Sequence, residues 1–229
     1  MLPMAGWEVL GVNVVATTLD STTNEHQSLD ATAPAVAEED ILRANFYGVL
    51  ARVLAAPLDD ESMELMRALA EHDDESALGQ SISAFGKLCV RTTVAKSNEE
   101  FTELFYGFGA GGELTPYGSY YITGLIYDKP LAELRGDMAR LGVESDPNNQ
   151  EPEDHIASIC EIMQGILTKS FDGQAPDEAR SFFHKHIAPW AGQFFEDLEK
   201  APSAALYMPV GTIGRLFMEI EREAFEMAA

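Results

Sequence analysis

The sequence predicts an all-α fold, a single-domain bundle of about nine helices that follows a flexible N-terminal arm. Two observations lead to this prediction. From Glu38 onward, apolar side chains recur at intervals of three and four residues, which places them on one face of an α-helix. Prolines and glycines separate these periodic stretches, and no stretch alternates apolar and polar residues as a half-buried strand does.

Four helices are predicted before a central loop. The first ends at Pro57, because the residue before a proline is disfavoured in helical geometry. Asp59 or Asp60 caps the second helix. The fourth begins at a capping box, in which Ser97 and Glu100 satisfy free N–H groups of the first turn. The predicted ranges are 38–56, 60–71, 77–94 and 97–106.

Residues 107–129 are predicted to form a long irregular loop in which glycines alternate with tyrosines and phenylalanines. A loop of this length inside a compact domain usually has a function. Five more helices follow, and Pro130 and Pro152 suit the first turns of two of them, while Gly142 suits a helix end. Their predicted ranges are 130–141, 152–167, 177–187, 189–200 and 210–227.

The first 37 residues differ from the rest of the chain. They are rich in Ala, Thr, Ser and Asn, contain no Lys or Arg, and show no sustained periodicity. We therefore interpret 1–37 as a flexible arm and 38–229 as the helical domain. The apolar stretch at 9–19 lacks the positively charged start of a secretory signal peptide, and Cys89 and Cys160 are too few for a disulfide framework. We expect a cytoplasmic protein.

The charge of the chain is strongly negative. Its 229 residues include 38 acidic and 15 basic side chains, for a formal net charge of −23. This excludes autonomous binding to nucleic-acid phosphates. Four of the acids lie in the first 37 residues, so the domain itself keeps −19 of this charge. No run approaches the roughly 18 to 20 apolar residues of a membrane-spanning helix, so no stable membrane insertion is expected.

A glycine-rich segment at 107–112 matches the spacing G-x-G-x-x-G, which lets a backbone approach a pyrophosphate in dinucleotide-binding proteins. That fingerprint requires a strand before the glycines and a helix after them. Here a predicted helix precedes the segment and a Pro- and Tyr-rich loop follows it. A flexible turn is therefore the favoured interpretation, with nucleotide binding as the alternative.

The run 151–155 places three carboxylates and an imidazole in the predicted first turn of the helix that starts at Pro152. Acids there complement the helix dipole, but three together also repel one another, so capping and cation binding both stand as interpretations. The spacing differs from that of a zinc site, and Cys160 belongs to the apolar stripe. No nucleophile motif lies beside the run, so we assign no catalytic residue and no metal. His184 and His186 point to nearly opposite sides of a helix, so they are not expected to bind one metal together, and they are expected at the surface or at its rim.

Three blocks of this sequence, in order, resemble the TorD/DmsD/NarJ family of redox-enzyme maturation chaperones. The acidic run is the most specific of them, and together they span about 38–229. In this chain, Phe101 and Tyr117 stand where several relatives have tryptophan. The blocks are Phe101, Leu104 and Phe105 with Thr115–Ser119, then Glu151–His155, then Phe183, His184, His186, Ile187, Pro189 and Trp190 with a last helix entered through Tyr207.

The resemblance implies an all-helical chaperone that binds the twin-arginine signal peptide and the apo form of a molybdenum-cofactor oxidoreductase until its cofactor is inserted. It implies no enzymatic activity and no cofactor of its own, and both monomers and domain-swapped dimers occur in the family. The sequence around Pro116 resembles that of the subgroup found with formate dehydrogenases, which suggests a formate dehydrogenase as the client. A relative of DMSO or TMAO reductase is the other expected client. The implied peptide-binding residues are Phe101, Leu104, Phe105, Tyr117, Ser119, Glu151, Asp154 and His155.

Such a peptide presents two guanidinium groups followed by an apolar segment. The carboxylates of the run 151–155 can accept hydrogen bonds from arginine. The apolar part of the peptide can be covered by Phe101, Leu104, Phe105 and the tyrosines of the central loop. This interpretation expects Asp154 and His155 at an accessible groove beside Phe105, with micromolar to submicromolar affinity. Two alternatives remain: a nucleotide-binding hydrolase or transferase that uses 107–112 with Asp154 and His155 as acid and base, and a helical adaptor with an acidic face.

Overall fold

The fold, taken from a computed structural model, is described for residues 12–14, 36–107, 111–145, 151–172 and 174–227. It confirms the all-α prediction, with ten α-helices and three short 3-10 or π-helical turns in these ranges. The helices are α1 (Glu38–Ala55), α2 (Asp60–Arg67), α3 (Ala77–Arg91), α4 (Val94–Phe101), α5 (Gly118–Thr123), α6 (Lys129–Leu141), α7 (Ile156–Leu167), α8 (Glu178–Phe182), α9 (Ala191–Lys200) and α10 (Met208–Met227). The turns are η2 (Ala68–Glu71), η3 (Thr102–Tyr106) and η4 (Phe183–Ile187).

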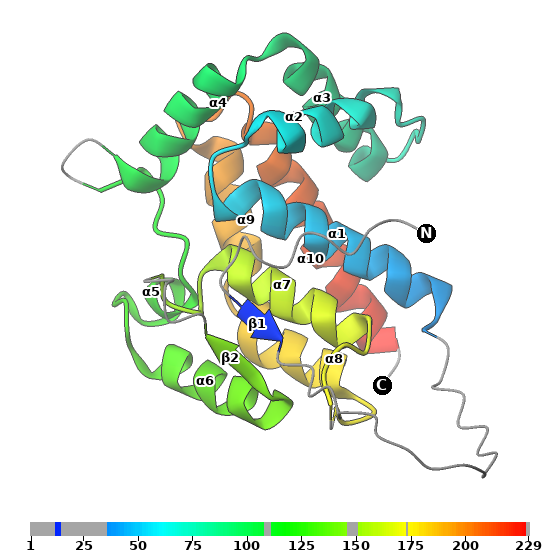
Figure 1. The fold of residues 1–229 in the computed structure, drawn as a ribbon, viewed down its shortest axis with the longest axis vertical. Helices are drawn as coiled ribbons and strands as arrows, with labels where there is room; N and C mark the ends of the chain where they lie inside the picture. The colour runs from blue at the N-terminus through cyan, green and yellow to red at the C-terminus, as the bar shows by residue number, and fades with distance from the viewer. Residues whose placement is uncertain (1–11, 15–35, 108–110, 146–150, 173, 228–229) are drawn as a thin grey trace, which may run out of the picture.

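The helices form a central group with smaller groups at its two ends (Figure 1). Helix α1 packs along α7, and α10 packs against both α9 and α3. Helices α2, α3 and α4 lie at one end of the molecule, and α5 and α6 lie at the other. The chain passes between these ends through the segment that follows η3, so this segment connects the aromatic block with the rest of the predicted site.

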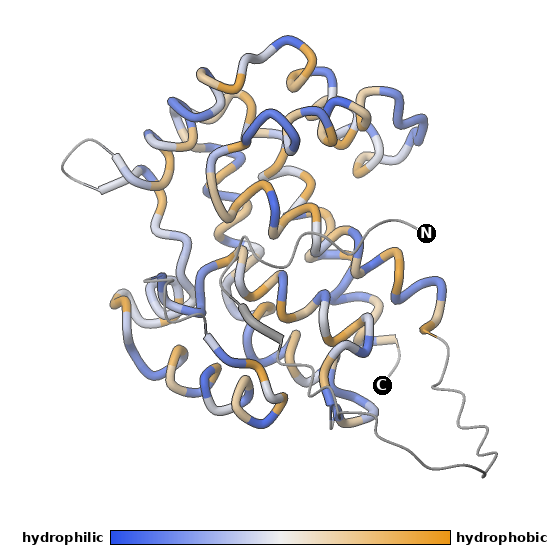
Figure 2. The backbone as a smooth tube through the Cα atoms, in the orientation of Figure 1, coloured by the Kyte–Doolittle hydropathy of each residue, from blue (hydrophilic) through white to orange (hydrophobic). Residues whose placement is uncertain are grey.

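Helix α7 is the centre of the core. Eleven of its twelve residues are buried, so it is apolar around most of its circumference, whereas the outer helices alternate hydrophobic and hydrophilic residues (Figure 2). The packing of α10 on α9 depends on close approach, because a Cβ atom on Gly211 would lie 2.4 Å from the backbone nitrogen of Glu199. The way the helices pack on one another thus depends on close contacts, such as the one at Gly211, that the periodicity of a single helix does not predict.

The start of α4 differs from the prediction. The helix begins at Val94, and its cap is Thr93, whose side chain accepts a hydrogen bond from the backbone N–H of Lys96. Ser97 is fully buried inside the helix. Glu100 instead accepts three backbone hydrogen bonds from residues 205–207, at 2.8 to 3.0 Å. The predicted capping box is therefore wrong, because a tertiary contact occupies the glutamate.

Two short strands also depart from the prediction that the chain has none. Strand β1 (Val12–Val14) pairs antiparallel with β2 (Val143–Ser145), which directly follows α6. Strand β1 lies within the predicted arm, and residues 1–11 and 15–35 of that arm lie outside the described ranges. Three residues are too few to produce a recognisable alternation in sequence. Within the described residues, no helix has the length and apolar character needed to cross a bilayer.

Candidate functional site

Two segments that the sequence treats separately lie side by side. The backbone N–H of Gly118 donates to the carbonyl of Asp154 at 2.9 Å, and the N–H of Ile156 donates to the carbonyl of Pro116 at 2.9 Å. Between these bonds, Tyr117 and His155 form an isolated antiparallel bridge. The structure therefore joins the Pro-Tyr-Gly-Ser part of the central loop to the acidic run. We call the paired segments 116–118 and 154–156 the junction.

Asp154 lies inside this junction and is 2% exposed. Its Oδ2 accepts hydrogen bonds from the backbone N–H of Ser119, at 2.7 Å, and from the Ser119 hydroxyl. Its Oδ1 is buried and has no hydrogen-bond partner among the described residues. The expectation of an accessible Asp154 is thus wrong for this structure, because the carboxylate holds the first turn of α5 in place.

His155 is the N-cap residue of α7. Its Nδ1 accepts a hydrogen bond from the backbone N–H of Ala157 at 3.2 Å, which requires the neutral ring with its proton on Nε2. Burial lowers the pKa of His155 to about 4. The ring is nevertheless partly accessible, and it packs edge to face against Tyr117 at a centroid distance of 5.3 Å.

The acidic run precedes α7 and does not form its first turn. Helix α7 begins at Ile156, four residues after the predicted start at Pro152, because the backbone of 154–156 pairs with the central loop. The three carboxylates have different surroundings. Glu153 is partly buried and binds Arg135 and Ser145, whereas Glu151 is exposed. No group of three metal-binding side chains occurs in the part of the chain that the structure describes.

Two tyrosines, Tyr117 and Tyr106, interact with Glu151, and a third, Tyr127, interacts with Tyr117. The Tyr117 hydroxyl donates to the Glu151 carboxylate, and burial together with this carboxylate raises the pKa of Tyr117. Burial and Glu151 also raise the pKa of Tyr106, and the hydroxyls of Tyr106 and Tyr127 both act electrostatically on Tyr117. Tyr106 and Tyr127 are 54% and 61% exposed. We call Tyr106, Tyr117, Tyr127 and Glu151 the tyrosine–carboxylate cluster.

The first block of the predicted site lies mostly in the core. Phe101 and Leu104 are buried, and Phe101 packs against Phe105 and Tyr207 at centroid distances of 4.7 and 5.7 Å. Phe105 is half-buried. Next to this block, Tyr106 at the end of the π-helical turn η3 is 54% exposed, and helical periodicity did not single it out.

The glycine-rich segment does not have the context of a dinucleotide site. Residues 108–110 lie outside the described ranges, and Gly107 before them has a positive φ of 65°. The backbone N–H of Leu114 donates to the carbonyl of Leu104 at 2.9 Å, so the segment is a loop closed at its base. A π-helical turn precedes it, and the next helix starts only at Gly118.

The third block contacts the junction through Trp190, whose indole packs against Gly118. A Cβ atom on Gly118 would lie 3.0 Å from Nε1 of Trp190, so a glycine is needed where the loop crosses the indole. The same Nε1 donates to the carbonyl of His186 at 2.8 Å. His184 is exposed as expected, but His186 is buried, which corrects the expectation that both histidines lie at the surface or its rim. Because residues two positions apart point to opposite sides of a helical turn, His186 faces the core when His184 faces solvent.

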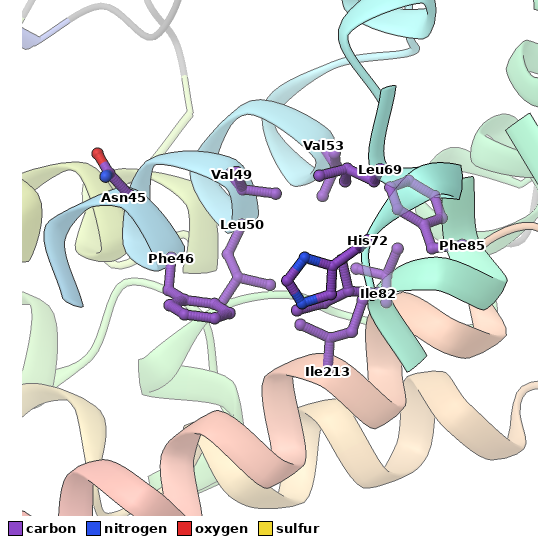
Figure 3. A pocket seen from close by; sticks show the side chains of 11 residues that line it. Asn45, Phe46, Val49, Leu50, Val53, Leu69, His72, Ile82, Phe85 and Ile213 are labelled. Carbon is purple, nitrogen blue, oxygen red and sulfur yellow. The ribbon is translucent and has the colours of Figure 1, made fainter. Parts of the chain in front are cut away.

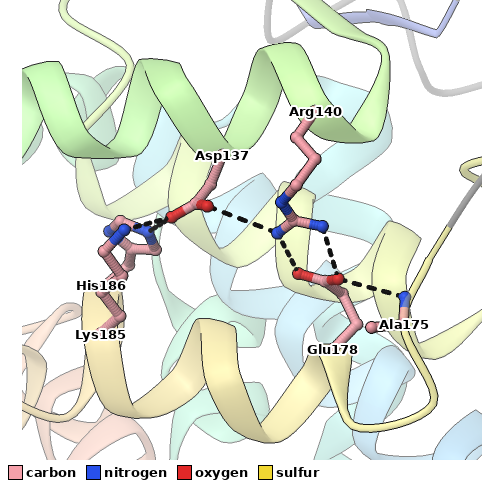
Figure 4. Close-up of polar contacts among 6 residues, drawn as sticks. All are labelled: Asp137, Arg140, Ala175, Glu178, Lys185 and His186. Atoms are coloured by element: carbon pink, nitrogen blue, oxygen red, sulfur yellow. Dashed lines mark hydrogen bonds and ion pairs between the residues drawn. The ribbon is translucent and has the colours of Figure 1, made fainter.

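An ion-pair network anchors α6, the helix after α5, to α8 and η4 (Figure 4). Asp137 binds Lys185 at 2.7 Å and His186 at 2.8 Å, and Arg140 makes two hydrogen bonds to Glu178, at 2.6 and 2.8 Å. Burial alone would raise the pKa of Asp137, but the bonds from Lys185 and His186 outweigh it and lower the pKa to about 2. The network therefore holds α6 against α8 and η4.

The cavities on the described surface include one beside the site and one away from it. One, of about 320 Å³, borders the site and is lined by Glu113, Leu114, Thr115, Tyr120, Tyr121, Asp197, Lys200, Ala201 and Pro202. The other, of about 180 Å³, lies among α1, η2, α3 and α10 and is almost entirely apolar (Figure 3). Phe46, Val49 and Ile213 point into it. It contains none of the predicted site residues.

The helical bundle and the junction on its surface are those of a redox enzyme maturation protein, and comparison with known proteins supports this class. The chain belongs to the nitrate reductase delta subunit family, whose model matches residues 62–196 and which includes the TorD chaperones. It is 24% identical over 199 residues to the chaperone protein TorD of Vibrio parahaemolyticus, covering 78% of this chain and 92% of that one. It is 25% identical over 172 residues to TorD of Vibrio vulnificus, covering 66% and 80%.

A solved structure shows the same fold. The crystal structure of a protein from Archaeoglobus fulgidus described as a redox enzyme maturation protein superposes with a TM-score of 0.52 and 18% identity, covering 78% of this chain and 94% of that one. The relatives named here are chaperones, which is consistent with a protein without enzymatic activity.

Proposed function

We propose that this protein is a cytoplasmic chaperone that binds the twin-arginine signal peptide and the apo form of a molybdenum-cofactor oxidoreductase, and holds that client until its cofactor is inserted. The observation that carries this proposal is the tyrosine–carboxylate cluster, in which an exposed Glu151 accepts a hydrogen bond from Tyr117 and interacts with Tyr106, on a domain of net charge −19. Membership in a family that includes TorD chaperones supports it.

The chemistry of the cluster suits a guanidinium group. A carboxylate accepts two parallel hydrogen bonds from arginine, and tyrosine rings offer faces on which the planar guanidinium can stack. Lysine presents a compact ammonium group with neither property, so an arginine pair should be preferred over a lysine pair. The negative charge of the whole domain accelerates the encounter with a basic peptide.

The predicted site residues divide into two groups. Phe105, Tyr117, Glu151 and His155 have accessible surface and are proposed to contact the peptide. Phe101, Leu104, Ser119 and Asp154 are buried and are proposed to position them. Asp154 acts through Ser119, because its hydrogen bonds fix the start of α5 beside Tyr117. The client is a formate dehydrogenase or a relative of DMSO or TMAO reductase, and the chaperone acts as a monomer or a domain-swapped dimer.

A calorimetric titration tests the proposal. The probe is a synthetic twin-arginine signal peptide, compared with the same peptide in which both arginines are replaced by lysine. Glu151→Gln should weaken binding of the arginine peptide by about 10-fold or more, since a hydrogen bond to a charged group contributes about 1.5 to 3 kcal/mol. The lysine peptide should bind more weakly to the unmodified protein.

Glu75→Gln is the matched control, because Glu75 is also exposed but lies between η2 and α3 at the opposite end of the molecule. It removes the same charge and should leave the affinity nearly unchanged. Equal effects of the two substitutions would assign the binding to net charge alone. No binding of either peptide would reject the proposed function.

A further inference from the structure

The chain between Ser119 and Asp128 exposes an unusual amount of apolar surface. Five large side chains within eight residues point outward, and no charged residue interrupts them. Elsewhere on the described surface, large exposed apolar side chains occur singly or in one adjacent pair. We call the five residues the apolar ridge: Tyr120, Ile122, Leu125, Ile126 and Tyr127, which are 43%, 44%, 64%, 48% and 61% exposed.

The ridge stands on a rigid support. Tyr121, between its first two members, points inward and packs against Trp190 and Phe194 at centroid distances of 5.6 and 6.0 Å. The Tyr121 hydroxyl donates to Asp197 at 3.0 Å. At the other end, Asp128 caps α6 through a 2.7 Å hydrogen bond. The apolar side chains are thus held outward by a backbone that is anchored on both sides.

The backbone of the ridge is also strained. Tyr127 has a φ of 61°, in the left-handed region that bulky side chains rarely adopt. Strain of this kind persists where the surrounding structure enforces it, and it is concentrated at binding sites. The side chain of Tyr127 belongs to the tyrosine–carboxylate cluster, where its hydroxyl acts electrostatically on Tyr117. The ridge therefore ends at the tyrosine–carboxylate cluster.

A large exposed apolar surface usually marks an interaction site, because exposing it to water is unfavourable by about 25 cal/mol per Å². The charge of the molecule limits what can cover the ridge. A second copy of this chain brings another net charge of −23 to the contact, and an anionic membrane surface is repelled in the same way. A peptide with an apolar segment next to a basic end fits this surface, because the apolar segment can cover the ridge while the basic end binds the Glu151 carboxylate.

We propose that the apolar ridge binds the apolar segment that follows the arginine pair of the client signal peptide. This inference rests on the proposed function and adds residues to it, since the ridge takes the role that the sequence assigned to Phe101 and Leu104. Those two side chains lie in the core and cannot contact a peptide at the surface. The peptide would run from the tyrosine–carboxylate cluster along 120–127.

The test uses the full chain with the substitutions Ile122→Ser, Leu125→Ser and Ile126→Ser combined. The matched control combines Leu65→Ser and Val90→Ser, which change exposed apolar side chains of α2 and α3 (52% and 59% exposed). Two peptides serve as probes in calorimetry: a twin-arginine peptide with a leucine-rich segment, and the same peptide with that segment replaced by Gly and Ser.

The ridge variant should bind the leucine-rich peptide at least 10-fold more weakly, while its affinity for the Gly-Ser peptide stays within 2-fold of the unmodified protein. The control variant should bind both peptides normally. Circular dichroism verifies folding, and Leu125→Ser alone, at the most exposed position of the ridge, replaces the triple variant if that does not fold; its affinity for the leucine-rich peptide should fall about 3-fold.

The two proposals fail in distinguishable ways. If the unmodified protein binds neither peptide, the proposed function is wrong and the ridge proposal falls with it. If it binds the leucine-rich peptide and the ridge variant binds it equally well, the ridge proposal alone is overturned. A ridge variant that loses dimerisation in sedimentation experiments but keeps its peptide affinity would make the ridge a contact between copies of this chain and would also overturn the proposal.

Discussion

Glu161 is a buried carboxyl group in the middle of α7, and its substitution by glutamine tests whether this group keeps its proton in the folded protein. The side chain is 6% exposed, its Oε2 has no hydrogen-bond partner, and it forms no ion pair with the described residues. Burial raises its pKa from 4.5 to about 7. The folded protein therefore keeps a proton that the unfolded chain loses.

The sign of the effect follows from this difference. Between pH 4.5 and 7 the unfolded state binds fewer protons at this position, so its contribution to the free energy of unfolding falls as the pH rises. Each unit of pKa difference corresponds to about 1.4 kcal/mol, so the loss reaches about 3 kcal/mol above pH 7. A glutamine side chain has no such dependence, although it keeps the cost of a buried polar group.

We expect Glu161→Gln to change the free energy of unfolding little at pH 5 and to raise it by about 1 to 3 kcal/mol at pH 8. Urea unfolding of both proteins at the two pH values measures this, because effects of all other titrating groups cancel in the comparison. Glu75→Gln, which removes a carboxyl group at an exposed position, is the control substitution. An equal change at pH 5 and pH 8, or a loss at pH 8, would refute the assigned ionisation of Glu161.

Two further predictions concern the junction beneath the candidate site. Asp154→Ala should lower the free energy of unfolding by about 2 to 4 kcal/mol, because Ser119 loses both hydrogen bonds to a buried carboxylate; urea unfolding at pH 7 measures this, and an unchanged midpoint would contradict the role of Asp154 in positioning α5. His155 has a lowered pKa of about 4, so its contribution to stability is present above the ordinary value of 6.5 and is lost as the pH falls toward 4. The loss is at most about 3 kcal/mol, since the ring is partly accessible. His155→Asn keeps a capping side chain and should flatten this part of the pH profile of unfolding, and a slope equal to that of the unmodified protein would assign it to another group.

The sequence alone predicted the helices whose limits are set by local chemistry. Pro57 and Gly142 stand at helix ends as expected, and the apolar stripe of 156–167 became the central buried helix. These features depend on residues near one another in the chain, which a period of 3.6 and a few capping preferences describe well. The family resemblance likewise rested on contiguous motifs, and the match of residues 62–196 confirmed it.

The functional surface depended on contacts that local patterns do not contain. Glu100 had the sequence of a capping residue, but it binds the backbone of 205–207, more than a hundred residues away. The acidic run offered three equivalent carboxylates, and only the pairing of 116–118 with 154–156 buried Asp154 and left Glu151 exposed among the tyrosines. Residue types specify which chemistry is available, whereas burial and partners, which the assembled bundle determines, select the groups that a ligand can reach.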